Sequence, residues 1–438
     1  MTLKLTLSLY SEKIHIIEAN DRESSMSHTV FTPITLPNGA TLPNRLAKAA
    51  MEENMAAIGH LPGASIYQLY KTWSSGGAGL LITGNVMVDH RAMTGPGGIV
   101  LAENTPLEPF KEWAKAGTQN GTQLWMQINH PGRQVYAAMG GQVLSPSDIA
   151  LDMGKHSKLF AKPMPMTETE ILALIKRFVT TASRAVEAGF NGVQIHAAHG
   201  YLLSQFLSPL TNKRNDQWGG SLDNRARLLY EIIKAVKKAL PENIVIAVKL
   251  NSADFQRGGF DSNEASAVVK ALGELKVDLV ELSGGSYESP AMQGNTADGR
   301  TLEREAYFLT FAKEIAKQAP MPIMTTGGIV RLSIAQKVLD EGVDMVGIGR
   351  ALAFSPNLPY RWKTSPDAIA TLPNVKWKDK TMAAIATMAI TKRQLQRMGK
   401  GKAPKSNSSP VISLIFDQIR LKKLTKIYRD RYTNSSNQ

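Results

Sequence analysis

The most informative run in this sequence reads His196-Ala-Ala-His199-Gly-Tyr201-Leu-Leu-Ser-Gln-Phe-Leu-Ser-Pro-Leu-Thr-Asn-Lys-Arg-Asn-Asp-Gln-Trp-Gly-Gly-Ser221. It follows a strand-like segment, Gly-Val-Gln-Ile at 192–195, and leads into a helix-like segment from Asn224. Two imidazoles and a phenol therefore stand close together at the C-terminal end of a strand. In a β/α barrel, that end of each strand faces the active site. The run thus predicts a catalytic site on a barrel.

Apolar, β-branched segments alternate with helix-length segments through most of the chain. Short apolar runs separated in this way are typical of parallel βαβ units. Eight in a row favour a closed (β/α)8 TIM barrel of class α/β over an open sheet. The Asn38-Gly39 pair that precedes them predicts a tight β-hairpin, which we expect to cap the bottom of the barrel. The eight predicted strands are Arg45–Ala50, Leu80–Val86, Gln123–Ile128, Val193–Ala197, Ile244–Leu250, Leu279–Ser283, Ile323–Thr326 and Met345–Ile348.

The composition excludes several classes of protein. The 438 residues include no cysteine, which excludes disulfides, cysteine-ligated clusters and thiol catalysis. No apolar stretch reaches the ~20 residues that span a bilayer. Charged residues interrupt positions 1–26, so we do not interpret them as a signal peptide. We expect residues 1–27 to be a disordered extension, or residues 1–25 to be translated upstream of the natural start. We expect a cytoplasmic location.

The charge is concentrated at the C-terminal end. The net charge is +14, and residues 374–438, with 15 Lys or Arg and 3 Asp, carry +12 of it. A Gly-, Pro- and Ser-rich linker at 399–410 divides this tail into two predicted helices, 380–398 and 411–431. The second helix is basic and carries seven large apolar residues, which favours packing on the barrel or on a second subunit. Contact with an anionic membrane surface, nonspecific nucleic-acid binding and disorder remain alternatives.

The run from His196 to Ser221 resembles, nearly residue for residue, the signature of the old yellow enzyme family of flavin oxidoreductases. In that family the first two polar residues are His and then His or Asn, and the Tyr follows two residues later. The resemblance covers about residues 30–360 and is specific at strands 3, 4, 7 and 8. It implies a single-domain FMN enzyme. We place its barrel at residues 28–365 and the basic helical extension at 366–438.

The residue types at 196–201 suit the reduction of an activated C=C bond. Two N–H donors, on His196 and His199, can polarise a substrate carbonyl as negative charge develops on its oxygen. The hydroxyl of Tyr201 can then donate a proton to the α-carbon. The alternatives are a metal-binding pair and core histidines that bond backbone groups. A metal site usually takes three or four ligands, and no further His or carboxylate stands at zinc-like spacing nearby.

The resemblance also implies residues that contact the flavin ring. Gln127, at the end of strand 3, matches the Gln that bonds the pyrimidine edge, and its amide offers both a donor and an acceptor. Lys249 stands where the family usually has Arg, and a cation there stabilises the reduced, anionic ring. A structural Lys paired with a carboxylate is the alternative. Gly84 matches a small residue under the ring, whereas His130 and Arg133 are expected to shape the rim or bind substrate.

Glycines at the last two strands imply a phosphate site. Gly327 and Gly328 end strand 7, and Gly349 and Arg350 end strand 8. These are the two loops that bind phosphate in many such barrels. Glycines let backbone N–H groups approach the phosphate, and the guanidinium adds a bidentate partner.

Strand 1 departs from the family pattern. Ala49, Ala50 and Met51 align with a flavin-contacting segment that usually reads Pro-Met or Pro-Leu and then Thr or Cys. That Thr or Cys contacts the flavin near O4 and N5, and here the position holds Glu52. A carboxylate turned to solvent or paired with Lys48 is the alternative interpretation.

Taken together, the sequence predicts an FMN-dependent ene-reductase that binds FMN non-covalently. NADH or NADPH would reduce the flavin and leave, and an electron-poor alkene would then be reduced in a ping-pong cycle. The expected partners are these small molecules and a second copy of the chain. Two rivals remain: a flavin-free, phosphate-binding isomerase or aldolase, and a non-catalytic barrel whose basic tail contacts a membrane surface.

Overall fold

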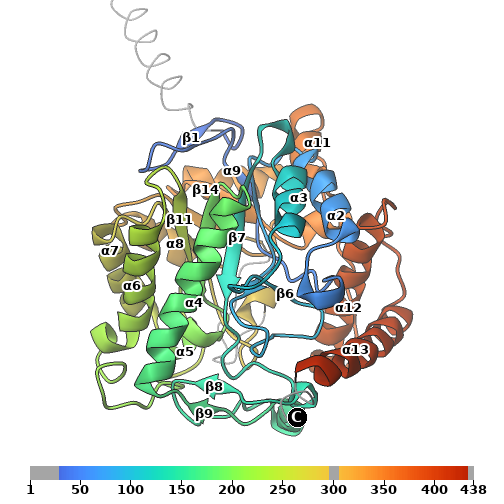
Figure 1. The fold of residues 1–438 in the computed structure, drawn as a ribbon. Helices are drawn as coiled ribbons and strands as arrows, with labels where there is room; N and C mark the ends of the chain where they lie inside the picture. Colours follow the sequence, from blue (N-terminus) through green and yellow to red (C-terminus); the bar gives the residue numbers. More distant parts are fainter. Residues whose placement is uncertain (1–28, 295–304, 433–438) are drawn as a thin grey trace, which may run out of the picture.

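The computed structural model describes residues 29–294 and 305–432, and the predicted disordered extension at 1–27 lies outside these residues. Eight parallel strands form a closed barrel in the order β10-β11-β12-β13-β14-β3-β4-β7, and β7 pairs with β10 to close the ring. Helices surround it (Figure 1). The strands are β3 (Leu46–Lys48), β4 (Leu80–Ile82), β7 (Gln123–Asn129), β10 (Gly192–Ala197), β11 (Val245–Asn251), β12 (Leu279–Ser283), β13 (Ile323–Thr326) and β14 (Met345–Ile348).

The predicted (β/α)8 barrel is thus confirmed, and its last three strands have the predicted bounds. The first two strands are shorter than predicted because the chain leaves the barrel after Lys48 and after Ile82. The helices around the barrel are α2 (Ala64–Ser74), α3 (Glu108–Gly117), α4 (Glu168–Glu187), α6 (Leu222–Ala239), α7 (Ser262–Glu274), α8 (Leu309–Ala316), α9 (Leu332–Asp340) and α11 (Leu358–Thr364).

Side-chain caps fix where several of these helices begin. Thr167 caps α4 in a capping box with Glu170, and Ser221 accepts a hydrogen bond from the backbone of Asn224 at the start of α6. Such caps bond backbone N–H groups that the first turn leaves free. The run that begins at His196 therefore ends where a helix begins.

The hairpin β1 (Ile34–Thr35) and β2 (Thr41–Leu42) closes the N-terminal end of the barrel, as predicted. Gly39 takes a φ of 87° in its turn, which a residue without a Cβ adopts without strain. Leu36 and Leu42 pack against side chains near the starts of the strands, including Trp125. In Figure 1 the hairpin lies at one end of the barrel, and β8 (Leu144–Ser145) and β9 (Met164–Pro165) lie at the other.

The C-terminal extension folds back onto the barrel. It consists of α12 (Lys380–Met398) and α13 (Pro410–Tyr432), which confirms the two predicted helices to within one residue. The two helices pack on each other, and α12 also contacts α2 and α10 (Ala351–Phe354). Within the described ranges, no helix combines the length and the apolar character needed to cross a membrane.

Candidate active site

The two histidines lie at the C-terminal end of β10 with their rings in edge-to-face contact, 5.1 Å between centroids. Nδ1 of His196 accepts the backbone N–H of Ala198 at 3.2 Å, so the neutral ring carries its proton on Nε2. Burial, and then the charge of Lys249, hold the pKa of His196 well below its usual range. His196 is therefore neutral and has one N–H left to donate.

His199 takes its place through two contacts with neighbouring strands. Its backbone N–H donates to Asn251 Oδ1 on β11 at 3.0 Å, and its Nε2 lies 2.7 Å from Ser283 Oγ on β12. Burial holds the pKa of this ring well below its usual range too. With Ser283 as the donor, the neutral ring carries its proton on Nδ1 and has that N–H available for a ligand.

Tyr201 stands against His196, with ring centroids 5.0 Å apart, and its hydroxyl lies 3.2 Å from that of Tyr287. Tyr287 comes from the loop that follows β12. Burial raises the pKa of the Tyr201 phenol, and the charge of Glu52 raises it further, whereas the hydrogen bond with Tyr287 lowers it. The phenol thus keeps its proton at neutral pH, and Tyr287 is placed to stabilise the phenolate that forms when this proton leaves.

The carboxylates of Glu52 and Glu53 have different partners. The carboxylate of Glu52 accepts a hydrogen bond from Thr94 Oγ1 at 2.7 Å, and its charge raises the pKa of Tyr201, Tyr287 and Tyr136. Glu52 therefore lies within electrostatic range of the phenols, and Lys48 pairs instead with Glu53, at 3.9 Å.

Gly84 leaves room for that second carboxylate. A Cβ built at Gly84 would lie 1.9 Å from Glu53 Oε2, and the backbone N–H of Gly84 donates to Glu53 Oε1 at 2.9 Å. A side chain at position 84 would clash with Glu53, so packing within the protein requires a glycine there. Ala49, Ala50 and Met51 connect β3 to these two carboxylates, and the Ala49 N–H bonds Ile348 on β14.

A ladder of polar side chains crosses the barrel interior beneath the histidines. Gln127 on β7 donates to Gln194 on β10 at 2.7 Å, and Gln194 donates to Glu281 on β12 at 2.8 Å. The other oxygen of Glu281 accepts from Lys249 Nζ on β11 at 2.7 Å. Lys249 thus has a buried counter-charge, the arrangement that the sequence left as the alternative to a flavin contact.

The ends of β13 and β14 differ from each other. Side chains built at Gly327 and Gly328 would meet Tyr307, which packs on both residues. A Cβ at Gly349 would meet nothing within 4 Å. Among the described residues no hydrogen bond or ion pair engages the guanidinium of Arg350. At the end of β14, the backbone of Gly349 is therefore uncovered, and the guanidinium of Arg350 beside it is available to bind an anion.

The side chain of Asn129 indicates whether a ligand with a polar ring fits this end of the barrel. It follows Gln127 by two residues on β7, so both side chains lie on the inner face of the strand. Asn129 is fully buried, yet neither its amide N nor its amide O has a hydrogen-bond partner among the residues that the structure describes. Such an unpaired amide is costly unless a ligand satisfies it. The donor and acceptor atoms of Gln127 and Asn129 fit the pyrimidine edge of FMN, and Gly349 and Arg350 fit its phosphate.

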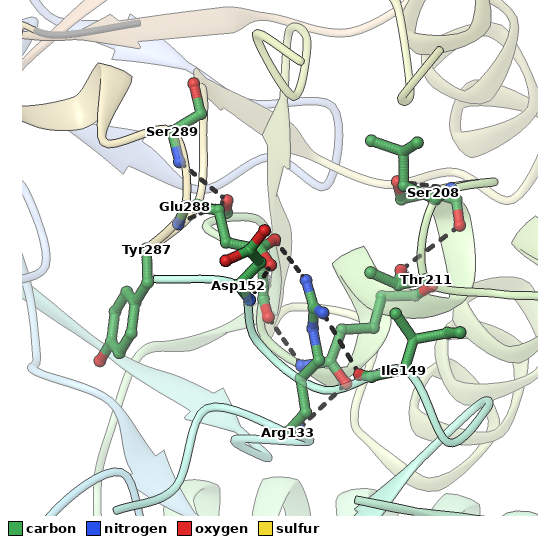
Figure 2. A network of polar contacts seen from close by, with 12 residues as sticks. Arg133, Ile149, Asp152, Ser208, Thr211, Tyr287, Glu288 and Ser289 are labelled. Carbon is green, nitrogen blue, oxygen red and sulfur yellow. Dashed lines mark hydrogen bonds and ion pairs between the residues drawn. The ribbon is translucent and has the colours of Figure 1, made fainter. Parts of the chain in front are cut away.

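An ion pair joins two loops at the rim of the barrel. Figure 2 shows Arg133, from the loop after β7, directed at Glu288 in the loop after β12, with Tyr287 beside it. Arg133 also donates to the carbonyls of Ile149 and Ala150, and Glu288 accepts the N–H of Asp152 at 2.7 Å. Arg133 therefore shapes the rim, and the network fixes the loop that carries Tyr287.

The C-terminal extension covers part of the same end. The hydroxyl of Tyr428 on α13 donates to the carbonyl of His90 at 2.9 Å, and the ring of Tyr432 stacks on the His90 imidazole at 5.2 Å. Lys155, in the loop after β7, pairs with Asp379 at the start of α12 at 3.0 Å. The packing expected for the tail is thus observed on the chain's own barrel, against loops that follow β4 and β7.

The sequence correctly predicted that His196, His199 and Tyr201 lie together, because one motif contains all three residues. It missed Tyr287 and Ser283, which reach the site from another strand. It also missed the ladder partners Gln194 and Glu281. A polar residue inside an otherwise apolar strand was the available signal for the last two. Within the described ranges no group of three or more His, Asp or Glu side chains is placed to hold a metal ion.

Known proteins resemble most of this chain. Residues 29–367 match the model of the NADH:flavin oxidoreductase / NADH oxidase family. The NADH-dependent flavin oxidoreductase iliE of Hypocrea jecorina (strain QM6a) is 38% identical over 351 residues, which cover 75% of this chain and 87% of that protein. The NADH oxidase of Thermoanaerobacter brockii is 33% identical over 329 residues, 73% of this chain and 48% of the relative.

Solved structures share the barrel. The old yellow enzyme homologue from Zymomonas mobilis superposes with a TM-score of 0.67 at 25% identity, covering 78% of this chain and 95% of its own. Morphinone reductase superposes with a TM-score of 0.65 at 23% identity, covering 79% of this chain and 92% of its own.

Proposed function

Because this chain belongs to the NADH:flavin oxidoreductase / NADH oxidase family and is of the old yellow enzyme type, we propose that it reduces electron-poor C=C bonds with NAD(P)H. The substrates would be enones and similar alkenes whose carbonyl can be polarised. One observation carries the proposal: a neutral His196 with a free Nε2–H, in ring contact with both His199 and Tyr201. Two donors and an acid at one point suit the delivery of a proton next to a polarised carbonyl.

The residues that would contact FMN come from two strands, β7 and β11, and from the turn after β14. Gln127 and Asn129 would bond the pyrimidine edge, and Gly349 with Arg350 would hold the phosphate. Bound FMN would supply hydride transfer, first from NAD(P)H to the flavin and then from the flavin to the β-carbon of the alkene. Lys249 would contribute less than a lone cation to stabilising the reduced ring, because Glu281 already neutralises it.

The chain's own residues would manage the carbonyl and the proton. His196 and His199 would donate hydrogen bonds to the carbonyl oxygen and stabilise the charge that develops there. Tyr201 would protonate the α-carbon. Its phenolate would form in a buried site near Glu52, where the hydroxyl of Tyr287 can stabilise it by donating a hydrogen bond. Tyr287 is more exposed than Tyr201, so it would also pass a proton from solvent.

The first experiment identifies the cofactor. The purified protein should be yellow, and acid release should yield FMN at about one per chain. A fully folded protein without flavin, or with FAD, would contradict the cofactor assignment and favour a flavin-free barrel enzyme.

The second experiment separates the residue roles. The phenol 4-hydroxybenzaldehyde should give a long-wavelength charge-transfer band that is lost in His196→Ala/His199→Ala while FMN stays bound. Tyr201→Phe should slow alkene reduction far more than flavin reduction by NAD(P)H. Equal slowing of the two half-reactions would contradict the role of Tyr201 as the acid.

A further inference from the structure

A positively charged groove lies along α13 at the catalytic end of the barrel. It encloses about 530 Å³ between α13 and Ala138 of η3 (Ala137–Met139), in the loop after β7. Lys422, Lys426 and Arg429 line it, and Asp430 is the one carboxylate in the lining. In the described part of the chain none of the three cations forms an ion pair with a carboxylate, so the groove keeps a net positive charge.

A row of aromatic side chains, which we call the aromatic wall, leads from the active site toward this groove. Tyr136, two residues before Ala138, stacks on Phe160 with 5.2 Å between ring centroids. Phe160 contacts Tyr287 at 5.9 Å, and the Tyr287 hydroxyl reaches Tyr201. A ligand lying along this wall would have one end at Tyr201 and the other in the groove.

Charges from the extension act on the same wall. Burial raises the pKa of Tyr136, Lys392 on α12 lowers it, and Glu52 and then Asp417 on α13 raise it. Tyr136 therefore lies within electrostatic range of both the extension and the carboxylate next to the active site. The groove is lined mainly by α13, which lies outside the residues 29–367 that match the family.

We propose that this groove binds the phosphate groups of a long ligand whose reacting end enters the active site. The inference rests on the proposed function, because NAD(P)H must place its nicotinamide at the flavin while its pyrophosphate stays outside the buried part of the site. Lysine and arginine side chains recognise phosphate by charge and by hydrogen bonding. A phosphate-bearing substrate, such as an acyl-coenzyme A thioester, shares this chemistry, and the test distinguishes the two.

The test uses charge reversal in the FMN-loaded, full-length protein. Lys422→Glu/Lys426→Glu alters the groove, and Lys400→Glu/Lys402→Glu makes the same change of charge at exposed lysines outside it. Each variant is assayed with NADH and with 1-benzyl-1,4-dihydronicotinamide, a hydride donor without phosphate. Binding of ADP-ribose and of coenzyme A is measured separately by calorimetry.

We expect the groove variant to raise the KM for NADH about tenfold and to weaken ADP-ribose binding similarly. The kcat, the FMN content and the rate with the benzyl donor should stay unchanged, and the control variant should resemble the wild type. Added salt should raise the wild-type KM for NADH and affect the groove variant less. Weakened coenzyme A binding with an unchanged KM for NADH would support the groove and assign it to the substrate.

An unchanged affinity for NADH, ADP-ribose and coenzyme A would overturn the proposal. So would an equal rise of KM for NADH and for the benzyl donor, because that donor has no phosphate to lose contact with. Failure of the proposed function is distinguishable: the wild type would then lack FMN or would not reduce an enone with the benzyl donor.

Discussion

Removal of the Glu281 carboxylate should destabilise the barrel strongly. Glu281 is fully buried and Lys249 is 3% exposed, and the two are joined at 2.7 Å. The second carboxylate oxygen accepts from Gln194 at 2.8 Å. Glu281→Ala would therefore leave both a buried ammonium without a counter-charge and a buried amide without an acceptor.

The size of the effect follows from these two losses. Breaking a buried ion pair by removing one partner costs about 3–5 kcal/mol. An orphaned buried donor costs about 1–3 kcal/mol, and the two terms overlap because one side chain serves both partners. We expect the free energy of unfolding to fall by about 4 kcal/mol, a large part of the 5–15 kcal/mol typical of a folded domain.

Urea denaturation followed by tryptophan fluorescence measures this loss. The matched control is Lys249→Met/Glu281→Gln, which removes both charges and keeps an oxygen acceptor for Gln194. Replacing both partners of a buried pair is often close to neutral, so the double variant should recover most of the stability. If Glu281→Ala has the same urea midpoint as the wild type, the ion pair with Glu281 does not offset the free-energy cost of burying Lys249. Equal destabilisation of the single and double variants would refute the reasoning as well.

Three further predictions concern pH, the flavin and the extension. Burial lowers the pKa of His60 and of His130 to about 4, so the unfolded chain binds protons that the folded chain does not. The free energy of unfolding should be at its full value above about pH 6.5 and should fall as the pH drops toward 4. At pH 5 the loss should be about 2 kcal/mol per histidine. A urea midpoint that does not change between pH 7.5 and 5 would contradict this. Glu52→Thr should raise the midpoint potential of bound FMN, because an anion opposes the charge gained on reduction; an unchanged potential would mean that the carboxylate is screened. Truncation after Asn374 should lower the melting temperature, since it uncovers the loops that Tyr428 and Tyr432 pack on; an unchanged melting temperature would show that this packing contributes little.

The barrel could be predicted because its strands are buried on both sides. Such strands appear as nearly continuous apolar runs, and helices separate them at regular intervals. The pairs β5 (Val86–Met87) with β6 (Ile99–Val100) and β8 with β9 were missed. Each of these strands has two residues, which is too short for any alternation of polar and apolar positions to be recognised.

The site could be predicted only as far as one motif extends. His196, His199 and Tyr201 are close in sequence at the end of one strand, which places all three at the same end of the barrel. The partner of Lys249 depends on which residue of β12 stands beside it, and the register pairs it with Glu281. The contact between Tyr201 and Tyr287 depends on the path of a loop 86 positions later in the chain. Neither relation leaves a local pattern in the sequence.

The extension packs on the barrel for a reason different from the one that its sequence suggested. The large apolar residues of α13 were expected to need covering, yet Ile412, Ile415 and Ile419 are 47–63% exposed. The residues that are buried are Ser413 and Tyr428, and Tyr428 is fixed by its hydrogen bond to a loop carbonyl. An apolar stripe identifies a packed helix face only when burial of that stripe dominates the docking. Here α13 packs along α12, and aromatic and polar contacts anchor its C-terminal end to the barrel. In this orientation its lysines line the groove and its isoleucines are exposed to solvent.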